Sequence, residues 1–195
     1  GVVFQDSVLD PLLTVRENLL VRARLYGTDR QEYEANVRLA IETAGVEPFL
    51  NRRYGKLSGG QRRRTDIARA LVHTPKILFL DEPTTYLDLT GQREFYAMIK
   101  ELKKQGKTII LILHDLSQAV RISDTLVVMN RAGSRSLDKA AHAGTDSDVK
   151  ATDFPGSIAM AGTPQECLQS HVIEDVFQTS WKRFTDEDGE YYFFE

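Results

Sequence analysis

Two short stretches of this chain carry residues whose types and spacing could handle the phosphates of a nucleotide. The first, Leu57-Ser58-Gly59-Gly60-Gln61, is a glycine pair where a helix is predicted to begin. Helix N-termini offer unpaired N–H groups and a positive dipole end, and glycines let an anion approach the backbone closely. The second stretch ends in the adjacent carboxylates Asp81 and Glu82. Together they predict a device that holds phosphates and hydrolyses the terminal one.

A predicted strand positions the two carboxylates. Residues 77–80 are four consecutive apolar residues, which favours a strand buried on both faces of a parallel sheet. Ligands bind at the carboxyl ends of such strands. Because successive side chains along a strand point in opposite directions, Asp81 and Glu82 need not share one role. An Asp-Glu pair that merely begins a surface loop is the alternative interpretation.

Capping boxes and apolar periodicity predict the surrounding elements. Thr14–Glu17 opens a helix that ends near Tyr26 and Gly27, and Thr28–Gln31 opens a second that ends at Gly45. The remaining predicted helices cover 61–72 and 92–105. A fully buried strand is predicted over 108–113, and a buried strand over 126–129 pairs with a strand over 157–161. A capping box at Thr163–Glu166 and a closing hairpin near 181–194, with its aromatic side chains in a core, complete the prediction.

The composition sets modest bounds on function. The chain has 195 residues, 42% of them hydrophobic, and its net charge of −3 gives no electrostatic reason to expect nucleic acid. The lone cysteine, Cys167, excludes an internal disulfide. No apolar run approaches the roughly 20 residues that span a bilayer, so membrane contact would come through partner subunits. The basic run Arg62, Arg63, Arg64 and Arg69 is predicted to be mostly a solvent-exposed helix face.

The motifs and their order resemble the ATPase subunits of ABC transporters. The matching segments are the signature motif at 57–61, the Walker B strand at 77–82, the D-loop at 83–88 and the H-loop histidine at 114. With the D-loop match, the surface-loop interpretation of Asp81 and Glu82 becomes weak. The resemblance implies an α/β fold: a P-loop NTPase-like ABC ATPase core, with a mostly parallel sheet flanked by helices, and an α-helical subdomain.

The same resemblance implies a division of the chain. The expected parts are a strand end and Q-loop at 1–6, the helical subdomain at 7–56, the ATPase core at 57–130, a flexible insertion at 131–156, and the C-terminal part of the core at 157–195. No G-x-x-x-x-G-K-[ST] phosphate loop occurs in the 195 residues. We therefore expect a fragment of a longer chain, without the N-terminal strands and the P-loop.

The roles of individual residues follow from the resemblance. Asp81 would hold Mg²⁺ through water, and Glu82 would polarise the water that attacks ATP. Gln5 matches the Q-loop residue that contacts Mg²⁺ and this water, although a lone Gln there is more often a strand-end polar residue. His114 would contact the γ-phosphate, although a His at a strand end is usually a surface residue.

A second group of residues would act across a dimer. In the family's head-to-tail dimer, Ser58, Gly59, Gly60 and Gln61 would bind the γ-phosphate of ATP held by the opposite subunit. Asp88 would couple the two nucleotide sites. The implied partners are a second ATPase subunit and transmembrane permease subunits at the cytoplasmic face of a membrane.

The transported substrate is open. Residues 84–89, 113–119 and 162–164 look like importers of iron–siderophore or cobalamin type, whereas 13–19 and 24–27 look like multidrug or polysaccharide exporters. The importer is favoured because more positions match. Two other classes stay open: a soluble ABC ATPase of DNA repair or translation, and a fragment that is inert by itself.

We expect the purified 195-residue chain neither to bind ATP tightly nor to hydrolyse it. A phosphate loop normally supplies the N–H cradle and the Lys for the β- and γ-phosphates, so Glu82 would have nothing to act on. A phosphate-release assay with Mg-ATP measures this. Turnover that Glu82→Gln abolishes would contradict the expectation.

Overall fold

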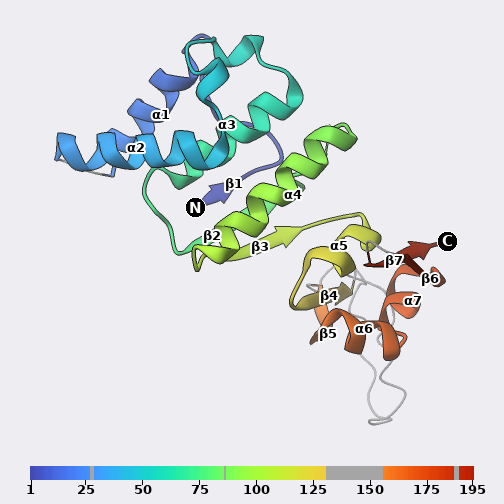
Figure 1. Cartoon of the computed structure of the whole chain (residues 1–195). Helices are drawn as coiled ribbons and strands as arrows, with labels where there is room; N and C mark the ends of the chain where they lie inside the picture. The colour runs from blue at the N-terminus through green and yellow to red at the C-terminus, as the bar shows by residue number, and fades with distance from the viewer. Residues whose placement is uncertain (27–28, 86, 131–155, 187–188) are drawn as a thin grey trace, which may run out of the picture. The chain divides into compact units, whose positions relative to one another are not determined.

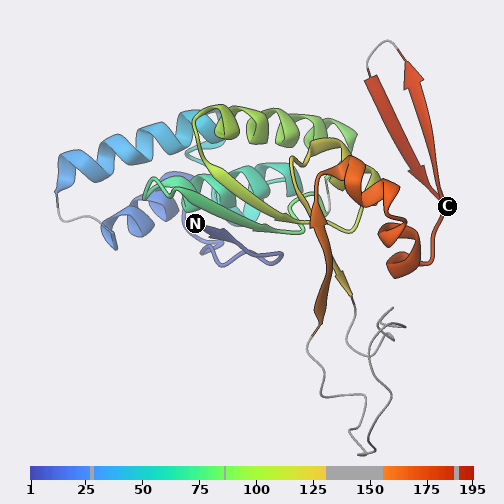
Figure 2. The ribbon, with the colours of Figure 1, turned by 90° about the horizontal axis from the view of Figure 1, so that it is seen from below.

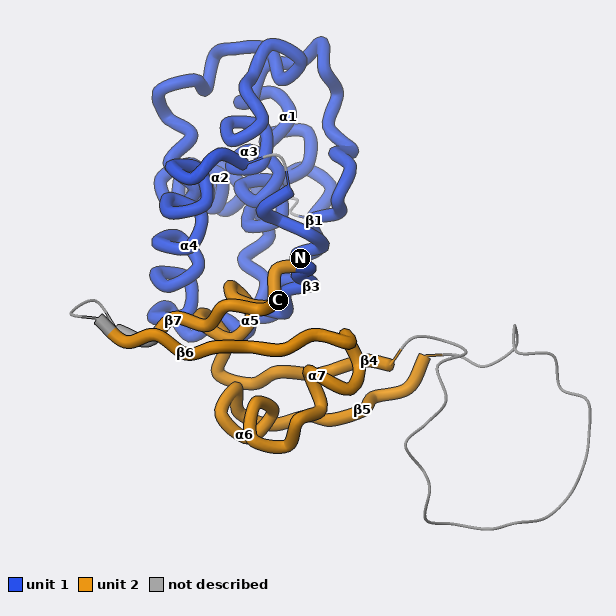
Figure 3. Tube along the Cα trace, turned by 90° about the vertical axis from the view of Figure 1, so that its right-hand side faces the viewer, with its two compact units in different colours: residues 1–114 blue, residues 115–195 orange. Residues whose placement is uncertain are grey.

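The chain divides into two compact units, residues Gly1–His114 and Asp115–Glu195, which are blue and orange in Figure 3. The computed structural model describes residues 1–26, 29–85, 87–130, 156–186 and 189–195. Each unit is described by itself below, and Figure 1 labels the elements.

The first unit is built on a parallel sheet in the order β1-β2-β3. Strand β1 (Val2–Val3) pairs with β2 (Ile77–Asp81), which pairs with β3 (Thr108–Ile112). The register places Val3 beside Leu80, and Asp81 beside Ile112. The carboxyl ends of all three strands therefore meet at one edge of the sheet, and the predicted parallel sheet is confirmed.

Only one face of this sheet is buried among the described residues. Val3, Leu78 and Leu80 are at most 1% exposed and join the core, whereas Phe79 is 45% and Ile112 54% exposed. The prediction that both strands are buried on both faces is therefore wrong for this chain. Figure 2 shows the helices of the unit gathered on one side of the strands, which is the physical reason.

Two capped helices follow β1. Helix α1 (Val15–Arg24) begins at Thr14, where the predicted capping box with Glu17 is present. Helix α2 (Arg30–Ala44) ends at Gly45, as predicted. Its N-cap is Asp29, whose carboxylate accepts from the Gln31 N–H. The cap predicted at Thr28 is therefore wrong by one residue, since Asp caps as well as Thr does; Gly27 and Thr28 themselves lie outside the described residues.

The remaining helices of the unit pack into one apolar core. After the 3-10 turns η1 (Glu47–Phe49) and η2 (Tyr54–Lys56) come α3 (Gly59–Leu71) and α4 (Leu89–Lys104). Both helices begin two or three residues earlier than predicted, because Ser58 and Asp88 cap them. Ile67 of α3 and Leu102 of α4 are fully buried in the shared core.

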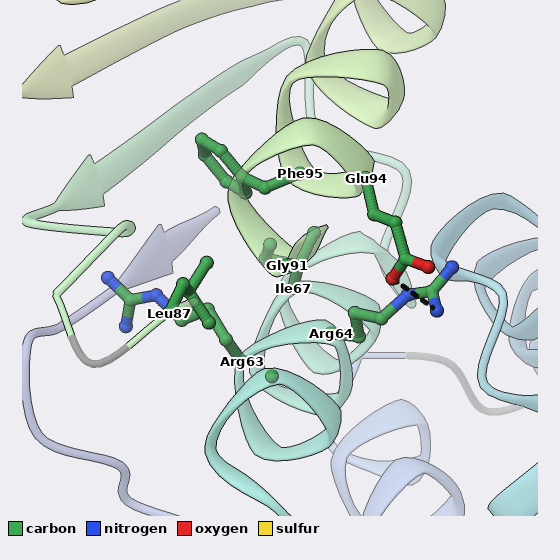
Figure 4. Close-up of a pocket in the computed structure, with 8 residues that line it drawn as sticks. Arg63, Arg64, Ile67, Leu87, Gly91, Glu94 and Phe95 are labelled. Carbon is green, nitrogen blue, oxygen red and sulfur yellow. Dashed lines mark hydrogen bonds and ion pairs between the residues drawn. The ribbon is translucent and has the colours of Figure 1, made fainter. Parts of the chain in front are cut away.

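Arg64 of α3 ties α2 and α4 together. Its Nε donates to the Ala44 carbonyl at 3.0 Å, and its Nη1 lies 3.3 Å from Glu94 Oε2 on α4 (Figure 4). Gly45 has φ +61°, and a Cβ there would lie 2.6 Å from Arg64 Nη2. Glycine is therefore favoured at this position by its left-handed backbone, and any larger residue would also make the end of the Arg64 side chain shift.

The second unit combines two antiparallel strand pairs with short helices. Its elements are α5 (Leu116–Ile122), β4 (Leu126–Asn130), β5 (Ser157–Gly162), α6 (Pro164–Gln169), α7 (Val172–Phe177), β6 (Trp181–Asp186) and β7 (Gly189–Phe194). The predicted pairing of β4 with β5, the capping box at Thr163 and the closing hairpin are confirmed. The insertion predicted at 131–156 lies outside the described residues except for Gly156.

Burial in the second unit is one-sided. Val128 is 6% exposed, but Val127 and Met129 on the same strand are 54% and 59% exposed, so the buried strand predicted at 126–129 is buried on one face only. In the hairpin Tyr192 joins the core, whereas Phe184 and Phe193 are exposed. No helix in the described part of the chain is long and apolar enough to cross a bilayer.

Candidate active site

The Glu82 carboxylate is the centre of a cluster of polar groups in the first unit. Gln5 Nε2 and Thr85 Oγ1 each donate to its Oε2 at 3.2 Å, and His114 Nε2 is hydrogen-bonded to its Oε1. These residues follow β1, β2 and β3, which run parallel and end at the same edge. The structure therefore brings together the three residues predicted to be catalytic, Gln5, Glu82 and His114.

The backbone at Glu82 is unusual. Its φ of +43° lies in the left-handed region, which a residue with a Cβ adopts at a cost of about 1 kcal/mol or more. Two hydrogen bonds hold it there: the Glu82 N–H donates to the Ile112 carbonyl at 3.1 Å, and its own carbonyl accepts from the Thr85 N–H at 3.3 Å. The conformation turns the chain sharply at the end of β2, and the Glu82 side chain is 18% exposed, against 79% for His114.

Arg63 holds the strand ends in place. Its guanidinium donates to the carbonyls of Phe4 at 2.6 Å, Asp81 at 2.5 Å and Pro83 at 3.1 Å. Carbonyls at the end of a sheet lose their ladder partners, and a buried one needs another donor. Arg63 supplies those donors for the segments that carry both Gln5 and Glu82.

Half of the basic run is therefore not a solvent-exposed face. Arg63 and Arg69 are each 7% exposed, and Arg69 Nη2 donates to the Val2 carbonyl at 2.8 Å. The prediction holds for Arg62, which is exposed, and is wrong for these two, because α3 turns them toward β1. The 3-residue helical spacing of Arg63, Asp66 and Arg69 was the available signal.

Asp66 lies between the two buried arginines on α3. Ser7 Oγ donates to its Oδ1 at 2.6 Å, and the Tyr54 hydroxyl lies 3.1 Å from both carboxylate oxygens. Burial raises the pKa of Asp66 and that of Tyr54, the latter to about 12, and burial lowers the pKa of Arg63. The segment that follows Gln5 is thus fastened to α3 by a buried polar network.

Asp81 and Gln5 offer oxygen atoms that suit Mg²⁺. Asp81 stands at the carboxyl end of β2, partly exposed, and its carbonyl rather than its carboxylate receives Arg63. Gln5 uses its Nε2 on Glu82, so its amide oxygen is left for a cation or water. No group of three or more His, Cys, Asp or Glu that could hold a metal occurs in the described residues. Mg²⁺ commonly takes one or two protein oxygens and keeps waters or phosphates, so a role of Asp81 and Gln5 in holding it stays a prediction.

Ser58 and Gln61 form a capping box at the start of α3. Ser58 Oγ accepts from the Gln61 N–H at 3.3 Å, and Gln61 Oε1 accepts from the Ser58 N–H at 3.2 Å. The S-x-x-Q pattern of residues 58–61 is the sequence signal for this box. Ser58 and Gly59 are exposed and Gly60 is half-buried, so the first N–H groups of the helix are open to a ligand.

The two stretches that are predicted to handle phosphate are not linked by hydrogen bonds in the part of the chain that the structure describes. Among the described residues no hydrogen bond links Ser58–Gln61 with Glu82 or His114. The capping box lies instead beside a small pocket between α3 and α4 (Figure 4). Gly60, Leu87 and Gly91 line it, and Asp88 caps α4 by accepting from the Gly91 N–H at 2.7 Å. A role of Asp88 in coupling two nucleotide sites stays a prediction.

Comparison with known proteins agrees with this geometry. Residues 1–85 match the family model described as "ABC transporter". The Nod factor export ATP-binding protein I of Burkholderia lata is 41% identical over 149 residues, which are 76% of this chain and 49% of that protein. Its counterpart in Rhizobium etli is 42% identical over 137 residues, 70% of this chain and 43% of that protein. The chain thus spans about half the length of the curated relatives it matches.

Solved structures that resemble this chain are also ABC transporter proteins. A bacterial ABC transporter cassette solved as a dimer is 32% identical, with a TM-score of 0.56 over 65% of this chain and 56% of that chain. A putative metal-chelate type ABC transporter reaches a TM-score of 0.73 over 100% of this chain and 71% of that chain, at 21% identity, which shows the fold alone. The fold is therefore the α/β ATPase cassette of P-loop NTPase type. In sequence and in fold the chain is therefore similar to the ATP-binding subunits of ABC transporters.

The contribution of the three Arg63 hydrogen bonds to stability can be measured by comparing a variant of Arg63 with a variant of its exposed neighbour Arg62. Arg63→Met leaves the Phe4, Asp81 and Pro83 carbonyls without their donor, so we expect a loss of about 3 kcal/mol in the free energy of unfolding. Arg62→Met, which removes one exposed bond to the Gly55 carbonyl, should cost less than about 1 kcal/mol. Urea denaturation measures both. Equal losses in the free energy of unfolding for the two variants would contradict the stabilising role of the three Arg63 hydrogen bonds.

The raised pKa of Asp66 predicts a pH dependence of stability. Because burial raises this pKa in the folded state, the folded protein holds a proton that the unfolded chain has already lost. The wild type should therefore lose stability relative to Asp66→Asn as the pH rises from about 4 through the raised pKa. Urea midpoints of the two proteins across that range measure the difference. A difference between the two urea midpoints that stays constant with pH would show that the pKa of Asp66 is not raised in the folded protein.

Proposed function

We propose that this chain is part of the ATP-hydrolysing subunit of an ABC transporter, which powers transport through transmembrane partner subunits. The observation that carries the proposal is the convergence of Gln5, Thr85 and His114 on the Glu82 carboxylate at the carboxyl edge of a parallel sheet. Similarity to the ATP-binding subunits of ABC transporters supports it.

In this proposal Glu82 polarises the water that attacks the γ-phosphate. Phosphoryl transfer depends on positioning and charge stabilisation, so a carboxylate that is held at a fixed angle is the central requirement. In the arrangement described, both oxygens of Glu82 are engaged, one by Gln5 and Thr85 and the other by His114. An attacking water would take the place of one of these donors, and His114, being 79% exposed, is free to turn toward the γ-phosphate.

Mg²⁺ would neutralise charge on the phosphates of ATP. Asp81 and the amide oxygen of Gln5 would hold it, consistent with their places at neighbouring strand ends. Binding of the metal would then fix the position of the Gln5 side chain, whose amide nitrogen already contacts the Glu82 carboxylate.

The site would be completed by a second ATPase subunit. The exposed N–H groups at Ser58, Gly59 and Gly60, with the side chain of Gln61, would bind the γ-phosphate of ATP held by that subunit, and Asp88 would couple the two sites. A dimeric relative supports this arrangement. The subunit would bind its membrane partners at the cytoplasmic face, and we propose no nucleic acid partner.

The direction of transport is better supported as export. The curated relatives at 41% and 42% identity are named as export ATP-binding proteins. The putative metal-chelate type transporter that covers the whole chain is only 21% identical, so it shows the fold alone, and the importer is supported by the sequence motifs only. Uptake of iron–siderophore or related chelates is therefore the second candidate.

Replacement of Glu82 tests the proposal in the full-length protein assembled with its membrane subunits. Glu82→Gln keeps the size of the side chain and removes the charge that polarises water, so ATP turnover should fall at least about 100-fold while ATP binding is retained. Glu101→Gln, on the exposed face of α4, is the matched control and should leave turnover within about 2-fold. Phosphate release and filter binding of ATP measure the two properties. Unchanged turnover in Glu82→Gln would remove Glu82 from the chemistry.

A further inference from the structure

A second cluster of polar groups lies away from the candidate active site. We call it the Arg22 cluster, and it comprises Arg22 and Tyr26 from the end of α1, Arg69 and His73 from the end of α3, and Lys107 before β3. The Tyr26 and His73 rings stack with centroids 4.4 Å apart and planes at 16°. Arg22 Nη2 donates to the Tyr26 hydroxyl at 2.5 Å, and its Cζ lies 4.7 Å from the centre of that ring.

Three buried nitrogens of this cluster have no hydrogen-bond partner among the described residues. They are Arg22 Nε, Arg69 Nε and His73 Nδ1. Arg69 as a whole is only 7% exposed. Buried polar atoms without partners are rare in native proteins, because such an atom loses its water without replacement. Three of them at one place indicate that the site has a component beyond the chain itself.

The charges of the cluster are also unbalanced. The charged side chains that act on His73 are Arg22, Arg69 and Lys107, and all of them are positive. Burial and these cations lower the pKa of His73. The one carboxylate that acts on Arg69, Asp66, is engaged by Ser7 and Tyr54.

Helix dipoles explain only part of this arrangement. Arg22 and Arg69 stand in the last turns of α1 and α3, where a positive charge is favourable. That effect needs neither the burial of both Nε atoms nor the gathering of two helix ends and Lys107 around one histidine. A bound counter-ion accounts for all three features.

We propose that the Arg22 cluster binds a phosphate group, either free or carried by a larger molecule. Guanidinium groups match phosphate oxygens as paired donors, and a dianion would offset the charges of Arg22 and Arg69. His73 would take up a proton when the anion binds and donate to it. Tyr26, stacked on His73, would fix the orientation of the imidazole.

This site is distinct from the nucleotide site. Arg69 and His73 lie at the carboxyl end of α3, whereas Ser58 caps its amino end, and the 13 residues of the helix span roughly 20 Å. Lys107 precedes β3, at the edge of the sheet opposite to Asp81 and Glu82. Phosphate at the Arg22 cluster therefore cannot be the γ-phosphate that Glu82 would act on.

The pKa of His73 reports occupancy of the site directly. In the 195-residue chain, inorganic phosphate should raise the His73 pKa by about one unit or more, measured by NMR of the imidazole protons, relative to sodium chloride at equal ionic strength. His73→Phe, which keeps the ring stack with Tyr26, assigns the signal. The same rise in phosphate and chloride would overturn the proposal, because it would show screening alone.

Thermal stability gives a second measurement with a matched control. At a phosphate concentration of about 100 times the dissociation constant, the Tm of unfolding should rise by about 5 °C over chloride. Arg22→Gln should lose most of this rise, whereas Arg24→Gln, exposed on the same last turn of α1, should keep it. A rise that survives Arg22→Gln would place the phosphate elsewhere and overturn the proposal.

Vesicles distinguish the two sources of the phosphate group. If the group is a lipid headgroup, the chain should float with vesicles of phosphatidic acid in phosphatidylcholine, and Arg22→Gln should abolish flotation. If the phosphate is free, the Tm rise should occur without flotation. If the chain shows no flotation and also no phosphate-specific rise in Tm, the proposal is overturned.

Discussion

The arrangement of the candidate active site depends on the three hydrogen bonds from the Arg63 guanidinium to backbone carbonyls. Parallel strands bring their carboxyl ends together, but the ladder stops there, and the last carbonyls have no partner across the sheet. Arg63 takes the place of the missing strand neighbours, because it binds the segments after β1 and β2 at once. Gln5 and Glu82 can then meet at a fixed separation although 77 residues separate them in sequence.

The stability of that arrangement comes from one face of α3. Arg63, Asp66 and Arg69 follow at three-residue spacing and are all buried, and each contacts the β1 segment or the loop after it. Burying charged groups is costly unless they are hydrogen-bonded. Arg63 makes three such bonds, Asp66 is bound by Ser7 and Tyr54, and Arg69 donates from its Nη2 to the Val2 carbonyl. The helix that begins at the Ser58 cap is therefore the same helix that fixes the segment carrying Gln5.

Much of the fold could be predicted from the sequence, because local signals fix it. The capping boxes at Thr14 and Thr163, the parallel strands and the pairing of β4 with β5 all follow from short patterns. The exposed face of the sheet could not be predicted, because Phe79 and Ile112 are apolar residues typical of a core. The neighbouring sequence does not indicate whether another element covers them. The meeting of Gln5, Glu82 and His114 was expected only from the family resemblance. The role of Arg63 was missed, because charge patterning cannot distinguish an exposed arginine from one that binds carbonyls.

Gly45 has a consequence for how this sequence can change in evolution. Its left-handed backbone leaves room for Arg64, whose Nη2 would lie 2.6 Å from any Cβ there. A substitution at position 45 would therefore shift the end of the Arg64 side chain, which binds the Ala44 carbonyl and lies beside Glu94. We expect positions 45, 64 and 94 to vary together. In an alignment of relatives, glycine at the first should co-occur with arginine at the second and an acidic residue at the third.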